Sequence, residues 1–283
     1  MKLNNTILST SQLSIGYASK KERVVVAENL NLNLDKGKLI ALIGANGVGK
    51  STLLRTLTGI QKPILGTIFL HNKALQDYDA LALSKKMSLV LTDKLPPSNL
   101  TVFELVALGR QPYTNWLGKL TAEDFFNINQ AMTQTQINAL AHKKHYEISD
   151  GQLQKVLIAR ALAQDTDLII LDEPTVGLDP IQIREIRELI RDLGQEHGVI
   201  LSTHILSEVQ ESCTRVQIIH QGRLVFNDRI EGLEQQMRAS SLLLATARTP
   251  DLEVMALMPP IQRIDDLGDH HYRIFHDKTE DPS

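Results

Sequence analysis

The stretch that decides the fold of this chain reads Gly44-Ala45-Asn46-Gly47-Val48-Gly49-Lys50-Ser51-Thr52. It matches G-x-x-x-x-G-K-[ST], the pattern of a loop that holds the phosphates of ATP or GTP. The glycines let successive backbone N–H groups turn inward around an anion, and the N-terminus of the following helix adds partial positive charge. In this pattern we expect Lys50 to reach the β- and γ-phosphates and the Ser51 hydroxyl to ligate Mg²⁺.

The residues on either side of this loop supply the structural context that the motif needs. Residues 39–43 form a short apolar run typical of a buried parallel strand. Leu53, Leu54 and Leu57 follow at helical spacing, and Gly59 is expected to end the helix. A chance glycine turn is the alternative, and the order of strand, glycine loop and helix argues against it.

Composition limits the classes of protein to which the chain can belong. With 283 residues, of which 42% are hydrophobic, it can bury one large core, or a core and a small satellite domain. A net charge of -3 and a pI near 6.3 give no general attraction to nucleic acid, so we expect no nucleic-acid partner. The single cysteine, Cys213, excludes an internal disulfide and suits a reducing cytosol. No apolar run is long enough to span a bilayer, so we expect a soluble protein that reaches a membrane only through a partner.

The N-terminal segment alternates between apolar and polar residues, as half-buried strands do. Residues 12–17, 24–26 and 30–34 are interpreted as antiparallel strands. They lead through a turn at residues 35–37 into the strand before the glycine loop. Residues 66–70 are expected to add another short strand to this β-layer.

From about residue 93 to residue 165 the pattern becomes helical. Thr101 and Glu104 have the spacing of a capping box. This spacing predicts a helix that begins there and runs through Leu108, with Gly109 ending it.

Two further parallel-type strands are expected at residues 168–171 and 198–203. A charged helix is predicted between them, at about residues 181–194, with pairs of opposite charge on its solvated face. Residues 216–226 then have the pattern of a β-hairpin. Together these segments indicate an α/β fold.

Residues 235–283 differ in character from the rest of the chain. Residues 241–247 and 271–275 are expected to be strands, with a short helix near residues 252–257. We interpret this segment as a small α+β extension with a regulatory or dimerisation role. A packing appendage without a ligand of its own is the alternative.

Two carboxylates end the apolar strand at residues 168–171. In P-loop NTPases an aspartate in the position of Asp172 holds Mg²⁺. The adjacent Glu173 can polarise the attacking water, because a carboxylate within hydrogen-bond reach acts as a general base. An ordinary helix-start cluster, Asp172-Glu173-Pro174, is the alternative, and the glycine loop upstream argues against it.

A second anion-binding point is indicated at residues 148–152, which precede a helical run. Ser149 and Gly151 stand where the N-terminus of that helix would bind an anion. One chain has no need of two phosphate sites so far apart in sequence, whereas two chains arranged head to tail would use both. His204 ends the strand at residues 198–203, where its imidazole is expected to reach the γ-phosphate and the water held by Glu173. A capped or exposed strand-end histidine is the alternative.

In their order and spacing these motifs resemble the ATP-binding subunit of an ABC transporter. The matching segments are GANGVGKST at 44–52, ISDGQ at 148–152, LIILDEP at 168–174, Gly177-Leu178-Asp179 and His204. The resemblance covers residues from about 9 to 232. It implies a P-loop NTPase with a RecA-like core, an antiparallel β-subdomain and a helical subdomain at about 93–165. These parts would form a nucleotide-binding domain of residues 1–234, followed by the extension at 235–283.

The resemblance also implies roles for individual residues. Lys50, Glu173 and His204 would be the catalytic residues, and Ser51 and Asp172 would ligate Mg²⁺. Tyr17 would stack on adenine. The residues around the phosphates would be Gly44, Ala45, Asn46, Gly47, Val48, Gly49, Lys50, Ser51 and Thr52, and those that complete the pocket of a second copy would be Ser149, Gly151, Gln152 and Asp179.

Within the family, residues 95–113 are similar to ATPases of iron–siderophore, haem and cobalamin importers. In the family this region forms the groove that receives a short helix from the membrane permease. The resemblance therefore implies an ATPase that uses ATP and Mg²⁺ to energise uptake, as a peripheral protein on the cytoplasmic face of the inner membrane. Its partners would be a second copy of itself, permease subunits and, indirectly, a substrate-binding protein.

The chain departs from the family's pattern in two places. The family usually has a glutamine after the strand at residues 87–91, where this chain has Thr92 and Asp93. Because aspartate can still ligate Mg²⁺ or orient water, Asp93 is a candidate metal ligand. Asp150 replaces the first glycine of the usual LSGGQ, whereas Ser149 and Gly151 are retained, so we expect an active enzyme.

Two other functions are compatible with the same motifs. The chain could be the ATPase subunit of an exporter, which would differ mainly in the permease that it meets. It could also be a soluble ABC-type ATPase in cluster assembly, translation or DNA repair. Fused nucleotide sites, long coiled-coil insertions or basic stripes would favour the soluble roles, and none is visible in the sequence.

Overall fold

The computed structural model describes residues 5–18, 23–91, 95–96, 98–206, 208–209, 213–233, 240–245, 252, 255, 261–268 and 270–276. The chain divides into two compact units, Met1–Asn227 and Asp228–Ser283. The domain boundary predicted between residues 234 and 235 falls within residues 234–239, which are not described. Its position therefore stays a prediction.

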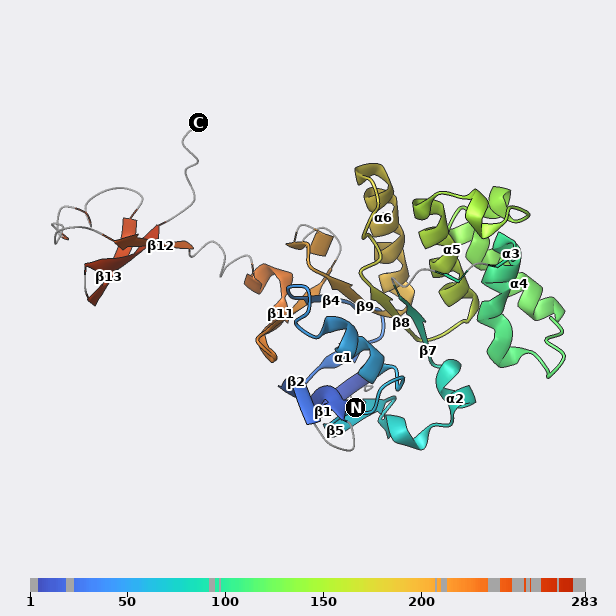
Figure 1. The fold of residues 1–283 in the computed structure, drawn as a ribbon, viewed down its shortest axis with the longest axis horizontal. Coiled ribbons are helices and arrows are strands. Elements are labelled where there is room, and N and C mark those ends of the chain that lie inside the picture. Colours follow the sequence, from blue (N-terminus) through green and yellow to red (C-terminus); the bar gives the residue numbers. More distant parts are fainter. Residues whose placement is uncertain are drawn as a thin grey trace. The chain divides into compact units, whose positions relative to one another are not determined.

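The first unit is built around a six-stranded sheet with the strand order β11-β10-β4-β9-β8-β7 (Figure 1). The five strands from β10 to β7 run parallel to one another. Every residue of β4, β8 and β9 is buried, because a parallel sheet that is covered on both faces has no solvated side. The strands are β4 (Leu39–Ile43), β7 (Met87–Val90), β8 (Leu168–Asp172), β9 (Gly198–Thr203), β10 (Arg215–His220) and β11 (Arg223–Arg229).

Two helices follow central strands of this sheet. Helix α1 (Lys50–Leu57) follows the glycine loop, and α6 (Pro180–Glu196) connects β8 to β9. Asp179 starts α6 because its carboxylate accepts hydrogen bonds from two backbone N–H groups, and Pro180 occupies the first turn. The charged helix predicted at residues 181–194 is therefore present.

An antiparallel sheet forms a second layer of the first unit. Strand β1 pairs with β2, β3 and β5, and β5 pairs with β6. The antiparallel strands predicted from alternation are confirmed, although β1 begins earlier than expected. The strands are β1 (Thr6–Ala18), β2 (Arg23–Leu30), β3 (Asn33–Asp35), β5 (Leu65–Leu70) and β6 (Lys73–Ala74).

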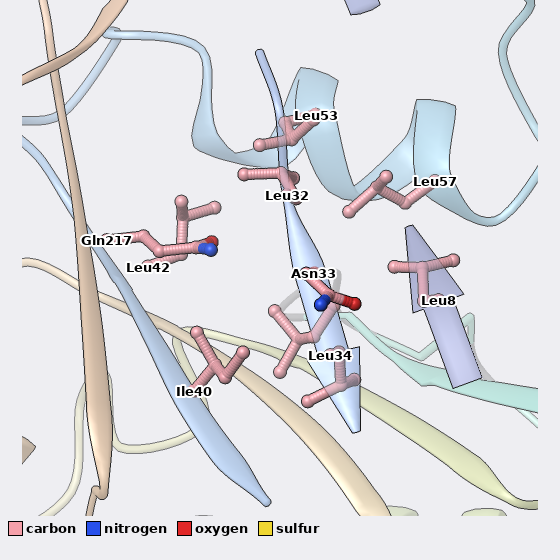
Figure 2. Close-up of a pocket in the computed structure, with 10 residues that line it drawn as sticks. Leu8, Leu32, Asn33, Leu34, Ile40, Leu42, Leu53, Leu57 and Gln217 are labelled. Atoms are coloured by element: carbon pink, nitrogen blue, oxygen red, sulfur yellow. The ribbon is translucent and has the colours of Figure 1, made fainter. Parts of the chain in front are cut away.

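The space between these layers is closely packed. Figure 2 shows Leu8, Leu32, Leu42, Leu53 and Leu57 gathered around a cavity of about 10 Å³. This volume is close to the smallest that holds one water molecule. No ligand of nucleotide size fits there.

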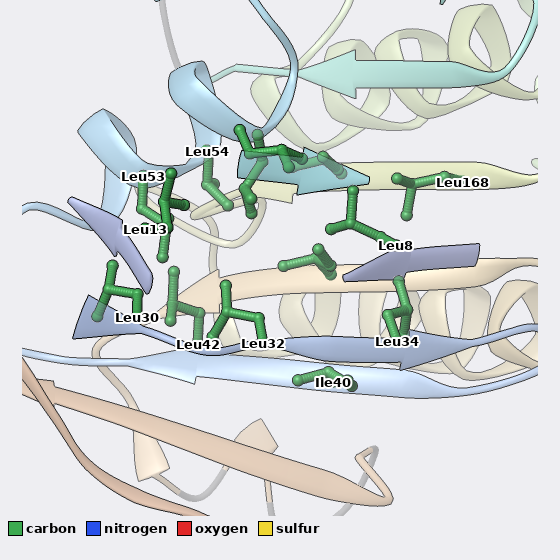
Figure 3. Packing of buried hydrophobic residues seen from close by; sticks show 14 of the residues in the cluster. Leu8, Leu13, Leu30, Leu32, Leu34, Ile40, Leu42, Leu53, Leu54 and Leu168 are labelled. Atoms are coloured by element: carbon green, nitrogen blue, oxygen red, sulfur yellow. The ribbon is translucent and has the colours of Figure 1, made fainter. Parts of the chain in front are cut away.

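The main hydrophobic core lies where the two sheets meet α1. In Figure 3, leucines from β1, β2, β4, α1 and β8 point toward a common centre. Leu8, Leu13, Leu30, Leu53 and Leu54 are among its fully buried members. This core fixes α1 against the sheet and so holds the glycine loop at the start of the helix.

A helical region lies between β7 and β8. Helices α3, α4 and α5 share a separate hydrophobic core, and each begins with a capping box, at Thr101, Thr121 and Ser149. Its elements are α3 (Val102–Ala107), the 3-10 helix η2 (Leu108–Tyr113), α4 (Ala122–Gln134), the 3-10 helices η3 (Asn138–Leu140) and η4 (His145–Glu147), and α5 (Asp150–Ala163). Before β7 lie the 3-10 helix η1 (Leu75–Asp77) and α2 (Ala80–Ser84).

The predicted end of the first of these helices is confirmed to within one residue, since α3 ends at Ala107, but Gly109 is not what ends it. The capping box at Thr101 and Glu104 is present, but the chain continues from Leu108 as the 3-10 helix η2. Gly109 serves close packing instead, since a Cβ atom there would lie 2.2 Å from the backbone oxygen of Arg160. A glycine at this position therefore lets η2 approach α5.

The second unit contains a three-stranded antiparallel sheet with the order β12-β14-β13. Strands β12 (Ser240–Ala245) and β14 (His271–His276) correspond to the two that were predicted. Strand β13 (Ile261–Gly268) was not predicted, because its Arg263, Asp265 and Asp266 hide the apolar alternation. The helix predicted near residues 252–257 lies largely outside the described residues.

Candidate nucleotide-binding site

The carboxyl ends of three neighbouring strands meet at one edge of the parallel sheet. Ile43, the last residue of β4, is in register with Thr203 at the end of β9. Asp172, the last residue of β8, is in register with Ser202. Parallel strands that end together bring the segments that follow them to one crevice, where open α/β sheets bind ligands. The glycine loop, Glu173 and His204 follow these three strands.

The glycine loop has the backbone conformation that an anion site requires. Gly49 precedes α1 with a φ of 108°, which side-chain-bearing residues rarely adopt. A Cβ atom there would also lie 2.4 Å from Cγ1 of Val26. No acidic residue stands in the first turn of α1, so the positive end of the helix dipole is available to an anion.

Lys50 is held inside this loop. Its side chain is almost fully buried, and its Nζ donates hydrogen bonds to the carbonyl oxygens of Gly44, at 2.8 Å, and Ala45, at 3.2 Å. The same ammonium lies 3.1 Å from Oε1 of Glu173. The residue expected to bind the triphosphate and the residue expected to activate water are therefore paired in this structure.

Glu173 has a backbone conformation that is unusual for a non-glycine residue. Its φ is 44°, in the left-handed region, and such strained residues are found disproportionately at functional sites. Its N–H donates to the carbonyl oxygen of Ser202 at 3.0 Å, which ties the end of β8 to β9. Its Oε1 also lies 3.5 Å from Nδ1 of His204. The structure thus brings Lys50, Glu173 and His204 together.

An open pocket of about 390 Å³ adjoins these residues, within the size range of small-molecule sites. Tyr17 stands on its wall with its ring about half exposed and its hydroxyl 3.1 Å from Oγ1 of Thr52. The exposed ring leaves an aromatic face available for stacking. The pocket is lined by Tyr17, Val26, Asn46, Gly47, Gly49, Lys50, Ser51, Thr52 and Glu173.

The residues beside this pocket fit a magnesium ion. Asp172 is buried, and its Oδ1 has no hydrogen-bond partner in the part of the chain that the structure describes. A buried carboxylate oxygen is costly to leave unpaired, and carboxylate and hydroxyl oxygens suit Mg²⁺. Ser51 lines the pocket and supplies such a hydroxyl. Asp93, the third expected ligand, lies outside the described residues.

The residues expected to complete the site of a second copy do not line this pocket in the described part of the chain. Ser149 and Gln152 form the capping box of α5, and Asp179 caps α6. Gly151 is buried against the side chain of Gln182. Each therefore has a local structural role within its own chain.

The replacement of a glycine by Asp150 in the ISDGQ segment has a local explanation. Asp150 is exposed and stands in the first turn of α5, where a carboxylate interacts favourably with the helix dipole. Its charge is therefore accommodated by the helix end within its own chain.

A second hollow lies in the region that was expected to form a docking groove. It has a volume of about 520 Å³ and is lined by Leu95, Ser98, Asn99, His145 and Tyr146. Tyr146 is exposed, so the hollow has an aromatic wall.

Two aromatic side chains of the helical region, Tyr113 and Trp116, differ in their surroundings. Tyr113 packs against Arg110, whose guanidinium carbon lies 3.9 Å from the ring centroid, and its hydroxyl donates to the carbonyl oxygen of Gln164. Trp116, in contrast, is 91% exposed. Its surroundings give no packing reason for a tryptophan.

Two features beside the site were not predicted from the sequence. The first is the ion pair between Lys50 and Glu173, which depends on β4 and β8 ending at the same edge of the sheet, on either side of β9. The second is the buried carboxylate of Glu208, which accepts hydrogen bonds from Thr175 and Thr203. The Lys50–Glu173 and Thr175–Glu208 contacts join residues far apart in sequence, and the bond of Glu208 to the nearby Thr203 has no recognised sequence pattern.

Comparison with known proteins identifies the family. Residues 27–176 match the ABC transporter family. The chain is 40% identical over 202 residues to the iron(3+)-hydroxamate import ATP-binding protein of Bacillus subtilis, covering 71% of this chain and 74% of that protein. It is 38% identical over 204 residues to the achromobactin transport ATP-binding protein of Dickeya dadantii, covering 71% and 74%.

One solved structure with a fold similar to that of this chain contains bound reaction products. It is an ATP-binding cassette in a dimeric post-hydrolysis state with ADP and Pi, which is 26% identical to this chain with a TM-score of 0.68. The match covers 79% of this chain and 99% of that one. Among the described residues of the present chain, no helix is both long and apolar enough to cross a membrane.

The fold and the site define a P-loop nucleoside triphosphatase. The chain belongs to the ABC transporter family, and it is an ATP-binding ATPase of that family. The resemblance stated from the motifs is therefore confirmed, as is the predicted fold class.

Proposed function

We propose that this chain is the ATP-hydrolysing subunit of an importer that takes up an iron chelate through a separate membrane permease. The observation that carries the proposal is the meeting of Lys50, Glu173, His204 and the orphaned oxygen of Asp172 at one edge of the sheet. The similarity to an iron(3+)-hydroxamate import protein supports the choice of cargo.

In the proposed reaction, the loop amides and Lys50 bind the triphosphate, and Ser51 and Asp172 hold Mg²⁺. When bound, Mg²⁺ would neutralise charge on the β- and γ-phosphates. Glu173 accepts a proton from water as the water oxygen attacks the γ-phosphorus. The bond to the bridging oxygen then breaks, giving ADP and phosphate. Phosphoryl transfer depends mostly on positioning and charge stabilisation, which these groups supply.

His204 has a positioning role in this proposal. Its Nδ1 lies 3.5 Å from Oε1 of Glu173, so the imidazole can orient the carboxylate and the water that it holds. Lys50 would have to exchange Glu173 for phosphate when ATP binds, because the ammonium now contacts both its own loop and that carboxylate. Nucleotide binding would therefore release the proposed base.

Two copies would act together. Ser149, Gly151, Gln152 and Asp179 stand at the starts of α5 and α6, away from the lining of their own pocket in the described chain. A head-to-tail partner would present them to the nucleotide as a second set of backbone donors. A similar cassette forms a dimer, which supports this arrangement.

The permease would dock at the hollow lined by Leu95, Ser98, Asn99, His145 and Tyr146. It lies beside α3 and η4, in the helical region whose sequence resembles importers of this type. The chain would be peripheral on the cytoplasmic face of the membrane. A substrate-binding protein would deliver the chelate on the opposite face.

Reconstitution with candidate permeases tests the proposed transport. The chain is incorporated with each permease into vesicles of phosphatidylethanolamine and phosphatidylglycerol, and phosphate release is measured with ferric hydroxamate, haem or cobalamin placed either on the side of the membrane opposite the ATPase or on the same side. We expect a ferric siderophore and its binding protein to stimulate release. Stimulation of phosphate release only by a compound on the same side of the membrane as the ATPase would contradict import. Stimulation by haem or cobalamin alone would contradict a ferric siderophore as the cargo.

A substitution in the glycine loop tests the nucleotide site itself. Lys50→Ala should lose ATP affinity, measured with a fluorescent ATP analogue, because an ammonium that faces the phosphates is removed. Lys119→Ala removes an exposed lysine outside the pocket lining and is the matched control. Equal affinity of Lys50→Ala and the native protein would reject the site.

A further inference from the structure

A buried carboxylate lies behind the candidate site. Glu208 is 1% exposed, and each of its oxygens accepts one threonine hydroxyl. Thr175 donates to Oε1 at 2.7 Å and Thr203 donates to Oε2 at 2.6 Å. Arg187 of α6 places a guanidinium nitrogen 3.7 Å from Oε1. A buried charge of this kind is tolerated only when it is paired and hydrogen-bonded, and these three residues meet that need.

The two threonines belong to the two segments that carry the proposed reacting groups. Thr175 stands two residues after Glu173, and Thr203 immediately precedes His204. Thr203 is further fixed because its Oγ1 accepts the N–H of Ile205 at 3.1 Å. Glu208 therefore clamps the turn after β8 to the end of β9, from a position outside the pocket lining.

The clamp formed by Glu208 lies beyond the point where backbone hydrogen bonds between β8 and β9 end. The last backbone hydrogen bond between these segments runs from the N–H of Glu173 to the carbonyl oxygen of Ser202. Beyond it, the described contacts that fix the separation of Glu173 from His204 are their own 3.5 Å contact and the two hydroxyl bonds to Glu208. The left-handed φ of Glu173 adds strain that such a clamp must resist.

We infer that Glu208 is a positioning residue for ATP hydrolysis, which sets the relative placement of Glu173 and His204. The inference rests on the roles proposed for those two residues. Glu208 lies outside the pocket lining, so it acts through its neighbours and not on the nucleotide. Its loss should change the rate of the chemical step more than the binding of ATP, because displacements of about 1 Å cost on the order of 100-fold in rate.

Steady-state hydrolysis by the purified full chain tests this inference. We expect Glu208→Ala to lower kcat by about 10- to 100-fold while KM for ATP changes less than about threefold. Glu208→Gln keeps the shape and one acceptor oxygen and should retain more activity than Glu208→Ala. Should Glu208→Ala fail to fold, Thr175→Val and Thr203→Val each remove one bond of the clamp and should each lower kcat. Native kcat in these variants would overturn the inference.

A buried threonine at the other end of β8 provides the matched control. Thr166 is buried and its hydroxyl contacts Oγ of Ser88 at 3.1 Å. Thr166→Val should lower Tm as Thr175→Val does, yet leave kcat near the native value. If Thr166→Val reduced kcat as strongly as Thr175→Val, the loss of kcat in the Glu208 variants would reflect general stability. The inference would then be wrong.

A double-substitution cycle separates this inference from the proposed function. In the His204→Ala background, Glu208→Ala should add little further loss of kcat, because residues that act as a unit are not additive. Full additivity would overturn the positioning role. If Glu173→Gln alone left hydrolysis intact, the proposed base would be wrong. If it abolished hydrolysis while Glu208→Ala did not change kcat, only the present inference would fail.

Discussion

Nζ of Lys50 lies 3.1 Å from Oε1 of Glu173, so the proposed phosphate-binding cation and the proposed base neutralise each other. Glu173 in turn contacts His204. In the proposed site, an arriving triphosphate would compete with Glu173 for the same ammonium. With the proposed roles, ATP binding and release of Glu173 from Lys50 would be two aspects of one exchange.

Glu173→Gln should bind ATP more tightly and hydrolyse it far more slowly. Removing the carboxylate charge frees Lys50 for phosphate, and a partly exposed ion pair of this strength corresponds to a gain of about fivefold in affinity. Loss of the base should cost about 100-fold or more in kcat. Titration with a fluorescent ATP analogue and a phosphate-release assay check the two effects, with Glu188→Gln on the exposed face of α6 as control. Unchanged turnover would refute the assigned base.

The buried pair of Arg110 and Asp124 should stabilise the helical region. Nε of Arg110 lies 2.8 Å from Oδ1 of Asp124, both side chains are 2% exposed, and NH1 of Arg110 donates to the carbonyl oxygen of Ala163. Arg110→Ala leaves Asp124 uncompensated and should lower the free energy of unfolding by about 3–5 kcal/mol. Urea unfolding measures this change. Arg184→Ala, which breaks an exposed pair, should cost less than about 1 kcal/mol.

The same carboxylate predicts a dependence of stability on pH. Burial raises the pKa of Asp124, but hydrogen bonds from Thr121 and Arg110 outweigh burial and hold the pKa below its ordinary 3.8. A lowered pKa contributes stability above that ordinary value, and the contribution is lost as the pH falls through the folded-state pKa. Asp124→Asn should therefore flatten the acid limb of a plot of unfolding free energy against pH. An unchanged acid limb would contradict the assignment.

Cys213 should report unfolding of the first unit. Burial, with a smaller effect from the charge of Glu208, raises the pKa of its thiol to about 12. Because the thiolate is the reactive form, labelling by iodoacetamide near neutral pH should be at least about 100-fold slower than in guanidinium chloride. The chain has no other cysteine, so the signal belongs to this residue alone. Rapid labelling of the folded protein would show that its surroundings are open.

The parts of the fold that the sequence predicted are those set by local pattern. The glycine loop, its flanking strand and helix, the capping box at Thr101 and the charged helix before β9 are all encoded within a few residues. The roles proposed for Asp172 and Glu173 follow from their place at the end of a strand. Parallel pairing of β4, β8 and β9 then supplied the meeting of distant motifs.

The parts that were missed depend on contacts between distant segments. Gly109 looked like a helix end, whereas the backbone of Arg160 is what excludes a side chain there. Glu208 looked like an ordinary charged residue, and only the fold brings Thr175 and Thr203 to it. Strand β13 was hidden by its charges, since alternation of apolar residues is the signal for a strand.

The central claim is that two copies enclose ATP, with Ser149 and Gly151 of each completing the pocket of the other. Light scattering on the Glu173→Gln variant with ATP and Mg²⁺ tests it most directly. We predict a molecular mass of two chains with ATP and of one chain without it. Gly151→Glu, added to the same variant, should abolish pairing while ATP still binds. A single-chain mass with ATP, whether or not the permease is present, would contradict the account.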